Sequence, residues 1–377
     1  MVCDDVLKKA VRTSDKDNEM AIEVLRHLSW AIRRNRHLVF FPTLSLALIE
    51  RLGQILNKNE TAAIRHAFAR RQDLKQMTGI VHCHVEVSFE EETHRAGDTI
   101  YVNARNQGGF ELFEECHFLT ENLLDAEFYK FFASVYQKMN RIDECVFKTT
   151  YFPLQGGGAT IKQVYKYECE TGNHFCLAIL DSDKKWPNYD GYGETARSFE
   201  EEYNDYVKRQ GVPLACHYYV MEKTSEIENL IPIDILKVYS SSDQKSFLAS
   251  HQKSMPYFDI KKGLEYRLFY EKDDALIEWR KEFPAEIDWP QLIEIKSKSV
   301  DGEDYDNQLK RAGFKPIVQP WGANILDRVL NPERKYKSQY DLKKINTTRM
   351  LQAQQNEWNI IGQLVFSWCC CFVRTMF

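Results

Sequence analysis

Short apolar segments alternate with longer amphipathic ones between residues 116 and 221, and this alternation restricts the fold more than any other feature of the sequence. The apolar segments, expected to be strands, cover 116–122, 145–154, 175–180 and 214–221. The segments between them, expected to be helices, cover 125–139, 159–169 and 194–210. Strands that alternate with helices predict an α/β fold, in which a parallel sheet is covered by helices.

Two of these segments carry the clearest patterns. The first expected helix has apolar residues at the spacing of one helical face, namely Phe128, Phe131, Phe132, Val135, Tyr136 and Met139. Asp125 at its start suits the positive end of the helix dipole. The segment 175–180 contains only apolar or small residues, which is typical of a strand buried on both faces.

Acidic residues stand where the expected strands end. Glu121 closes the first strand, Asp181 and Asp183 follow the third, and Glu222 and Glu226 follow the fourth. Because right-handed crossovers bring the carboxyl ends of parallel strands to one edge, we expect these carboxylates to meet there. Crowded carboxylates repel one another unless a cation neutralises them, and oxygen ligands suit Mg²⁺ or Mn²⁺. The alternative for the aspartates is an ordinary cap where a strand enters a loop.

A run of three glycines, 156–158, separates the second expected strand from the helix after it. Such a run can cradle phosphate on its backbone N–H groups, or it can make a tight strand-to-helix connection. The sequence leaves both open. It contains no GxxxxGK[ST] segment, so a P-loop for ATP is not expected.

This arrangement resembles the TOPRIM domain, which primases, topoisomerases and nucleases share. The resemblance rests on a strand that ends at Glu121 with Asp125 after it, and on a later apolar strand followed by Asp181-x-Asp183. The glycine run and the segment 226–230 are similar to the OLD-type TOPRIM nucleases and their relatives in bacterial anti-phage systems. The resemblance covers residues 112–235.

The chain departs from the TOPRIM pattern at two positions. Asn122 stands where the family commonly has Gly after the first Glu, which affects the geometry around Glu121. Trp186 stands where topoisomerases and primases often have Gly, which argues against those two activities.

The resemblance implies an endonuclease that depends on Mg²⁺ or Mn²⁺, with two ions in its site, and cleaves phosphodiester bonds of DNA or of RNA, tRNA included. The metal ligands that it implies are Glu121, Asp181 and Asp183 at the core, with Asp125, Glu226 and Glu228 beside them. Lys184 is expected to meet phosphate charge in the transition state; a solvated lysine is the alternative.

OLD-type proteins often carry an ATPase in the same chain, and this sequence lacks one. The resemblance therefore implies a defence effector whose ATPase, or other defence-system subunit, is a separate chain. A non-catalytic TOPRIM-fold subunit that binds or assembles a defence complex is the second function that fits. A homo-oligomer also stays open.

Outside the TOPRIM-like segment, the sequence predicts two further regions. Residues 1–110 are expected to form a helical and β unit without chemistry, with helices within 20–41, 44–56 and 60–77 and strands within 79–89 and 98–103. Residues 111–235 would be the catalytic domain. Residues 236–377 are expected to be mainly helical, with helices over 319–330 and 349–368.

Composition points to a cytoplasmic protein that does not enter a membrane. The ten cysteines form no CxxC pair, which predicts reduced and mostly buried thiols. The apolar run 360–373 contains Gln363 and Ser367 and is too short to span a bilayer. A net charge of −5 requires any surface for nucleic acid to be local. The segment His82-Cys83-His84 has metal-binding residue types, but no fourth ligand is evident.

Overall fold

The computed structural model describes residues 1–12, 16–106, 110–184, 189, 191–252, 255–263 and 318–373. The chain forms two compact units, and neither is continuous in sequence. Unit 1 contains Met1–Leu180, Ser198–Tyr219 and Asn359–Phe377, and unit 2 contains Asp181–Arg197 and Val220–Trp358. The boundary predicted near 110 falls inside unit 1, and the one near 235 falls inside unit 2.

A four-stranded sheet organises unit 1, with the strand order β6-β4-β7-β8. Its strands are β4 (His117–Thr120), β6 (Phe152–Gln155), β7 (Cys176–Leu180) and β8 (Cys216–Val220). β4 runs parallel to both of its neighbours, β6 and β7. The α/β class with a parallel sheet is thereby confirmed. Pro153, which cannot donate a backbone hydrogen bond, lies in the edge strand β6.

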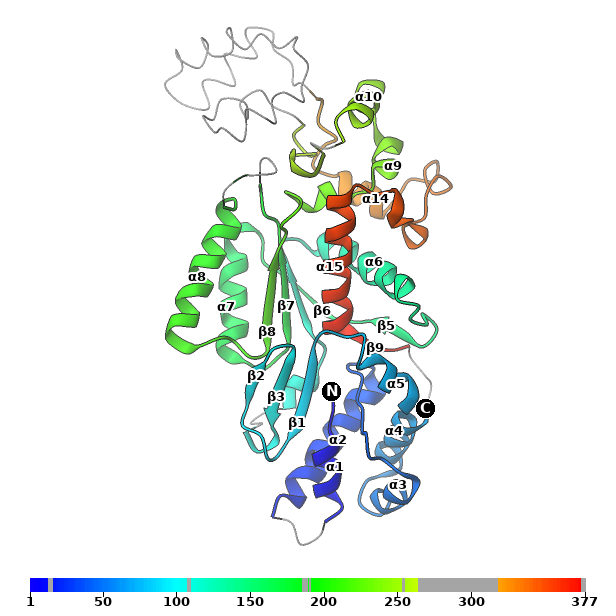
Figure 1. Ribbon diagram of the computed structural model, residues 1–377, viewed down its shortest axis with the longest axis vertical. Coiled ribbons are helices and arrows are strands. Elements are labelled where there is room, and N and C mark those ends of the chain that lie inside the picture. Colours follow the sequence, from blue (N-terminus) through cyan, green and yellow to red (C-terminus); the bar gives the residue numbers. More distant parts are fainter. Residues whose placement is uncertain are drawn as a thin grey trace. The chain divides into compact units, whose positions relative to one another are not determined.

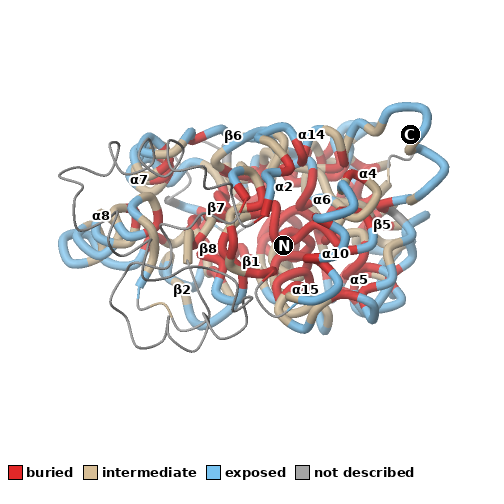
Figure 2. Tube along the Cα trace, turned by 90° about the horizontal axis from the view of Figure 1, so that it is seen from above, coloured by how far each residue is buried: buried red, intermediate tan, exposed pale blue. Residues whose placement is uncertain are grey.

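Helices cover both faces of this sheet (Figure 1). α6 (Leu123–Met139) lies on one face, and α7 (Ile161–Thr171) and α8 (Glu194–Gln210) lie on the other. Phe118 of β4 packs against Tyr129 of α6 with ring centroids 6.0 Å apart. On the opposite face, Tyr165 of α7 contacts Phe199 of α8 at 4.9 Å. The central strand β7 is buried along its whole length, whereas α8 exposes much of its outer side (Figure 2).

The segment 145–154, expected to be one strand, forms two strands in different sheets. β5 (Phe147–Thr149) pairs with β9 (Cys370–Phe372), and β6 joins the four-stranded sheet. The switch lies between them, because the N–H of Thr150 donates to Cys369 O at 2.8 Å while the N–H of Phe152 donates to Cys116 O at 2.9 Å. The expected strand is therefore divided because its two halves pair with segments that are remote in sequence, one at Cys369 and the other at Cys116.

The rest of unit 1 is built from short helices and a small sheet. The helices are α1 (Asp4–Ala10), α2 (Asn18–Arg34), α3 (Leu46–Leu52), α4 (Lys58–Ala69) and α5 (Arg71–Met77). α2 ends earlier than expected because Asn35 adopts a left-handed conformation, with φ 53°. The small sheet has the order β1-β3-β2, with β1 (His84–Ser88) parallel and β2 (His94–Ala96) antiparallel to β3 (Thr99–Asn103).

Unit 2 consists of short helices around polar anchors. The described helices that lie wholly within unit 2 are the 3-10 helices η4 (Ile227–Leu230), η5 (Lys237–Tyr239), η6 (Met255–Tyr257), η8 (Leu342–Lys344) and η9 (Thr347–Arg349), and the α-helices α9 (Ile233–Leu236), α10 (Ser242–Ser250) and α14 (Ile325–Leu330). The buried side chain of Asn229 donates to the carbonyls of Met255 and Phe258, both at 2.8 Å. These bonds fix η4 against η6, and η4 carries part of the site described below.

The C-terminal apolar run lies in α15 (Gln352–Cys369) and β9. Among the helices that the structure describes, none is long and apolar enough to cross a membrane. All ten cysteines are free thiols, and most are buried, as the sequence predicted.

Candidate active site

The chain leaves β7 through the turn Asp181-Ser182-Asp183, which the segment after β8 holds in place. The backbone N–H groups of Ser182 and Asp183 both donate to the carbonyl of Ser225, at 2.9 and 3.0 Å. The hydroxyl of Ser182 is fully buried and donates to the carbonyl of Thr224 at 2.6 Å. Ser182 thus anchors the turn and thereby fixes the backbone positions of Asp181 and Asp183, which flank it.

Asp183 sits in an unusual backbone conformation, left-handed with φ 51°. Gly193 packs directly against its side chain, since a Cβ added at Gly193 would lie 2.2 Å from Cβ of Asp183. Burial raises the pKa of Asp183, and the positive charges of Lys261 and Lys262 act in the opposite direction. The structure therefore keeps a partly desolvated carboxyl group in a position that a larger residue at 193 would displace.

Two glutamates and one lysine of unit 2 form an ion-paired group close to Asp181. The ammonium of Lys261 lies 3.2 Å from Oε2 of Glu226 and 3.3 Å from Oε2 of Glu228. Burial raises the pKa of Glu226 to about 7. Burial acts to lower the pKa of Lys261, but the carboxylates of Glu228, Glu226 and Asp181 outweigh it and raise that pKa above its usual value.

These contacts define what we call the acidic cluster: Asp181, Asp183, Glu226 and Glu228, with Lys261 among them. Its potential donors are all carboxylate oxygens, the ligand type that Mg²⁺ and Mn²⁺ prefer. The group already holds a positive charge, the Lys261 ammonium. The carboxylates of the cluster stabilise the partly buried ammonium of Lys261 by their negative charge. The same negative charge would also stabilise a divalent cation.

Glu121 and Asp125 belong to unit 1, at the end of β4. β4 and β7 pair in parallel, so both strands end at the same edge of the sheet, and Glu121 and Asp181 are the residues that follow them. Oδ2 of Asp125 accepts a hydrogen bond from the N–H of Asn122 at 2.9 Å in a reciprocal cap. α6 consequently begins at Leu123, two residues before the expected start. The role of Glu121 and Asp125 as metal ligands stays a prediction.

Lys184 has partners within the protein. Its ammonium donates to the carbonyl of Glu222 at 3.4 Å and lies 5.2 Å from the ring centroid of Tyr192. Its expected contact with phosphate stays a prediction. Trp186, which departs from the TOPRIM pattern, lies outside the described residues.

The glycine run makes a tight connection. The N–H groups of Gly156 and Gly157 donate to the carbonyls of Thr120 and Glu121, at 2.9 and 3.0 Å. A Cβ added at Gly156 would lie 2.5 Å from Cα of Ile161, so this position admits only glycine. Because these two N–H groups already have backbone partners, the strand-to-helix connection explains the run, and phosphate binding is not needed to account for it.

Sequence reasoning missed Lys261. It follows η6 and stands far along the chain from Asp181, with no motif around it. The signal that the sequence does contain is the pair Lys261-Lys262 after Asp259, which becomes informative only when η4 and η6 are known to be neighbours.

Comparisons with protein-family models, with curated proteins and with solved structures return no match for this chain. The candidate site therefore rests on the chain's own residues and geometry.

Proposed function

We propose that this chain is a metal-dependent nuclease of the TOPRIM type, which cleaves phosphodiester bonds of DNA or RNA in the cytoplasm as an effector of bacterial anti-phage defence. One observation carries the proposal: the carboxylates of Asp181, Asp183, Glu226 and Glu228 all interact with the Lys261 ammonium, beside the turn by which the chain leaves a parallel strand. Open α/β sheets bind ligands at the edge where the carboxyl ends of their strands lie.

The residues of the acidic cluster would hold Mg²⁺ or Mn²⁺, with Glu121 as a further ligand. When bound, the metal supplies Lewis-acid stabilisation of the negative charge that develops on the scissile phosphate. Ser182 contributes by position, because its buried hydrogen bond sets the direction of the aspartates beside it. Lys261 keeps its proton throughout the neutral range and offsets carboxylate charge before substrate binds.

A second function, a non-catalytic subunit that binds or assembles a defence complex, is favoured by a specific contact. Lys261 bridges Glu226 and Glu228 at 3.2 and 3.3 Å and so neutralises part of the cluster without any metal. In that case the cluster is a structural ion-pair network. The two functions differ in whether a divalent cation binds there at all.

The test combines metal binding with cleavage. Mn²⁺ binding to the chelator-treated full chain is measured by electron paramagnetic resonance, and cleavage of labelled single-stranded DNA, duplex DNA and tRNA is followed with Mg²⁺, Mn²⁺ or EDTA. We expect Mn²⁺ to bind, EDTA to stop cleavage, and Asp183→Asn to weaken both. If Asp183→Asn and Glu228→Gln both leave Mn²⁺ binding unchanged, the metal-site assignment is wrong. The binding measurement needs no partner chain.

A further inference from the structure

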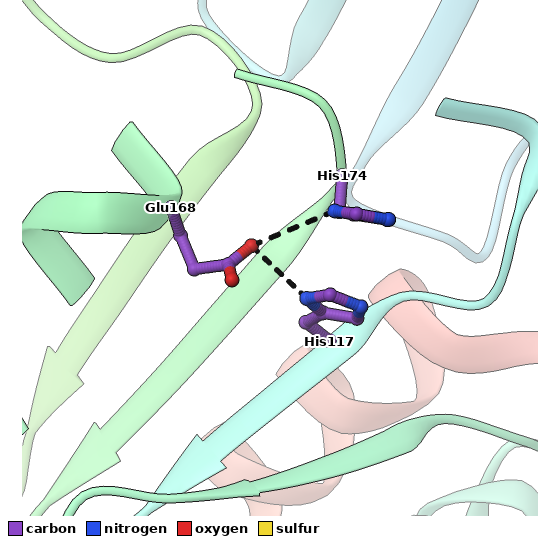
Figure 3. A group of neighbouring side chains, drawn as sticks. All are labelled: His117, Glu168 and His174. Carbon is purple, nitrogen blue, oxygen red and sulfur yellow. Dashed lines mark hydrogen bonds and ion pairs between the residues drawn. The ribbon is translucent and has the colours of Figure 1, made fainter. Parts of the chain in front are cut away.

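A second group of metal-ligand side chains lies in unit 1, where β4 and β7 begin (Figure 3). His117 opens β4, Glu168 stands in the last turn of α7, and His174 lies in the connection from α7 to β7. Oε2 of Glu168 is 3.0 Å from Nδ1 of His117 and 3.8 Å from Nδ1 of His174. One ligand atom from each residue lies within 4.8 Å of the others.

The backbone brings His117 to Glu168 and His174, which stand much further along the chain. α7 ends at Gly172, whose left-handed conformation (φ 60°) turns the chain back, so His174 stands just before β7. The N–H of His117 donates to the carbonyl of Phe175 at 2.7 Å, which joins the beginnings of β4 and β7. The group therefore depends on the sheet register and on where α7 ends.

The charges of the group call for a cation. Glu168 is buried, with only 5% of its surface exposed, so its carboxylate needs a positive partner. The rings of His117 and His174 stack with centroids 3.9 Å apart and an interplanar angle of 20°. Two positive charges at that separation would repel each other. A divalent ion bound to two neutral imidazoles and one carboxylate avoids this repulsion.

The ligand types select zinc. Two imidazole nitrogens and one carboxylate oxygen, with a water molecule in the fourth position, are a usual ligand set for Zn²⁺, whereas Mg²⁺ favours oxygen alone. Zinc bonds of about 2.0–2.2 Å require ligand atoms roughly 3–4 Å apart, so modest side-chain rotations close the site. His174 lies outside any helix or strand, unlike His117 and Glu168.

We propose that His117, Glu168 and His174 form a zinc-binding site at the edge where β4 and β7 begin. The ion would join three elements, β4, α7 and the connection to β7, and would stabilise the fold of unit 1. This site is separate from the acidic cluster, and its existence does not rest on the proposed nuclease function.

Neighbouring thiols are the competing ligands. Cys176 is the register partner of His117, and it shares hydrogen bonds with Cys216, which in turn bonds Cys169. Among the described His, Cys, Asp and Glu residues, the group whose ligand atoms lie within 4.8 Å of one another here is His117, Glu168 and His174, so the nitrogen and oxygen set is favoured.

The experiment measures zinc on the chelator-treated full chain in excess Mg²⁺, which competes with zinc for sites made of oxygen ligands alone. We expect one Zn²⁺ per chain by equilibrium dialysis and metal analysis, with a melting temperature several degrees higher than with Mg²⁺ alone. Co²⁺ in place of Zn²⁺ should give a visible spectrum without a thiolate charge-transfer band. Absence of stoichiometric zinc, or a strong thiolate band, would overturn the proposal.

Variants locate the site. His174→Asn and Glu168→Gln should each lower zinc affinity at least tenfold and remove the rise in melting temperature. The matched control is His84→Asn, in the His82-Cys83-His84 segment, where Nε2 of His84 contacts the carbonyl of Thr78 at 3.0 Å. Zinc binding lost in His84→Asn, or retained in both site variants, would contradict the assignment. Should Glu168→Gln fold poorly, the Co²⁺ spectrum of the unaltered chain still decides.

Discussion

The carboxylate of Asp181 accepts a hydrogen bond at 3.0 Å from the backbone N–H of Ile227. This bond joins the end of β7 to the segment that carries Glu226 and Glu228, on either side of Ile227. The acidic cluster is therefore held by backbone contacts as well as by charge. A carboxylate with a fixed N–H partner stays oriented even when no cation balances it.

The first prediction concerns Ser182, the buried residue between the two aspartates. Ser182→Ala leaves the carbonyl of Thr224 without its 2.6 Å partner, and we expect a loss of about 1–3 kcal/mol in the free energy of unfolding. Mn²⁺ affinity should fall as the turn loosens. Ser250→Ala is the control, since that hydroxyl bonds the carbonyl of Ser246 at an exposed site and should change stability by less than about 0.5 kcal/mol. Equal effects in chemical denaturation would argue against the anchoring role.

The second prediction separates charge from conformation at Asp183. Asp183→Asn removes the charge but keeps a side chain that tolerates the left-handed backbone, so the fold should hold. Cleavage with Mn²⁺ should fall roughly a thousandfold, equivalent to about 4 kcal/mol of transition-state stabilisation. Asp183→Ala should lose the same activity and also about 1 kcal/mol of stability, because Ala disfavours this conformation. Near-normal cleavage by Asp183→Asn would exclude a ligand role.

The third prediction tests whether the N-terminal 110 residues carry chemistry. Glu121→Gln should weaken Mn²⁺ binding and reduce cleavage by at least tenfold, because Glu121 follows the strand next to β7. Arg70→Ala removes a partly exposed contact with Asp73 at 3.3 Å, and it should leave cleavage unchanged. The reverse pattern, with cleavage lost in Arg70→Ala and kept in Glu121→Gln, would move the active site into the N-terminal residues.

The strands β4, β7 and β8 of the four-stranded sheet, and the helices that cover it, could be predicted from the sequence because their signals are local. The apolar run of β7 and the helical periodicity of α6 each lie within one segment. The division of 145–154 into two strands could not be predicted. It arises because the N–H of Thr150 donates to Cys369 whereas the N–H of Phe152 donates to Cys116. The same holds for Lys261 and for the group of His117, Glu168 and His174. Their contacts follow from sheet register and from loop packing, which local patterns do not encode.

The fourth prediction is a dependence of stability on pH through His217 in β8. Burial, with the charge of Arg95, lowers the pKa of His217 to about 4, so the folded state keeps this ring neutral. Below pH 6.5 the unfolded chain binds a proton that the folded chain does not, and stability is lost as pH falls towards 4. Between pH 7 and 5 the loss from this residue is about 2 kcal/mol.

Denaturation of His217→Phe at several pH values checks the fourth prediction. The variant keeps an aromatic ring for the stack on Trp368, where the centroids lie 5.8 Å apart. Its stability should fall less steeply between pH 7 and 5 than that of the unaltered chain. His94→Phe, at an exposed ring stacked on Tyr101, is the control and should keep the original slope. Parallel slopes for all three proteins would show that His217 does not carry the effect.

The last prediction uses Lys261 to decide whether the acidic cluster is a metal site or a structural ion-pair network. Lys261→Met removes the ammonium that bridges Glu226 and Glu228, both of which are largely buried. In EDTA at pH 7.5 we expect a loss of about 2–4 kcal/mol, since the carboxylates are left without their partner. Lys262→Met is the matched control: that ammonium is more exposed, pairs with Asp259 at 2.8 Å, and should matter by less than about 1 kcal/mol.

Mn²⁺ then distinguishes the two functions of the cluster. If it is a metal site, Lys261→Met binds Mn²⁺ more tightly than the unaltered chain, because a competing positive charge is gone, and Mn²⁺ restores most of the lost stability. If it is a structural network, Mn²⁺ restores nothing, and Lys261→Met stays destabilised at every metal concentration. Thermal melting of both lysine variants across a Mn²⁺ titration gives the answer without a substrate or a partner chain, so an inactive preparation cannot obscure it.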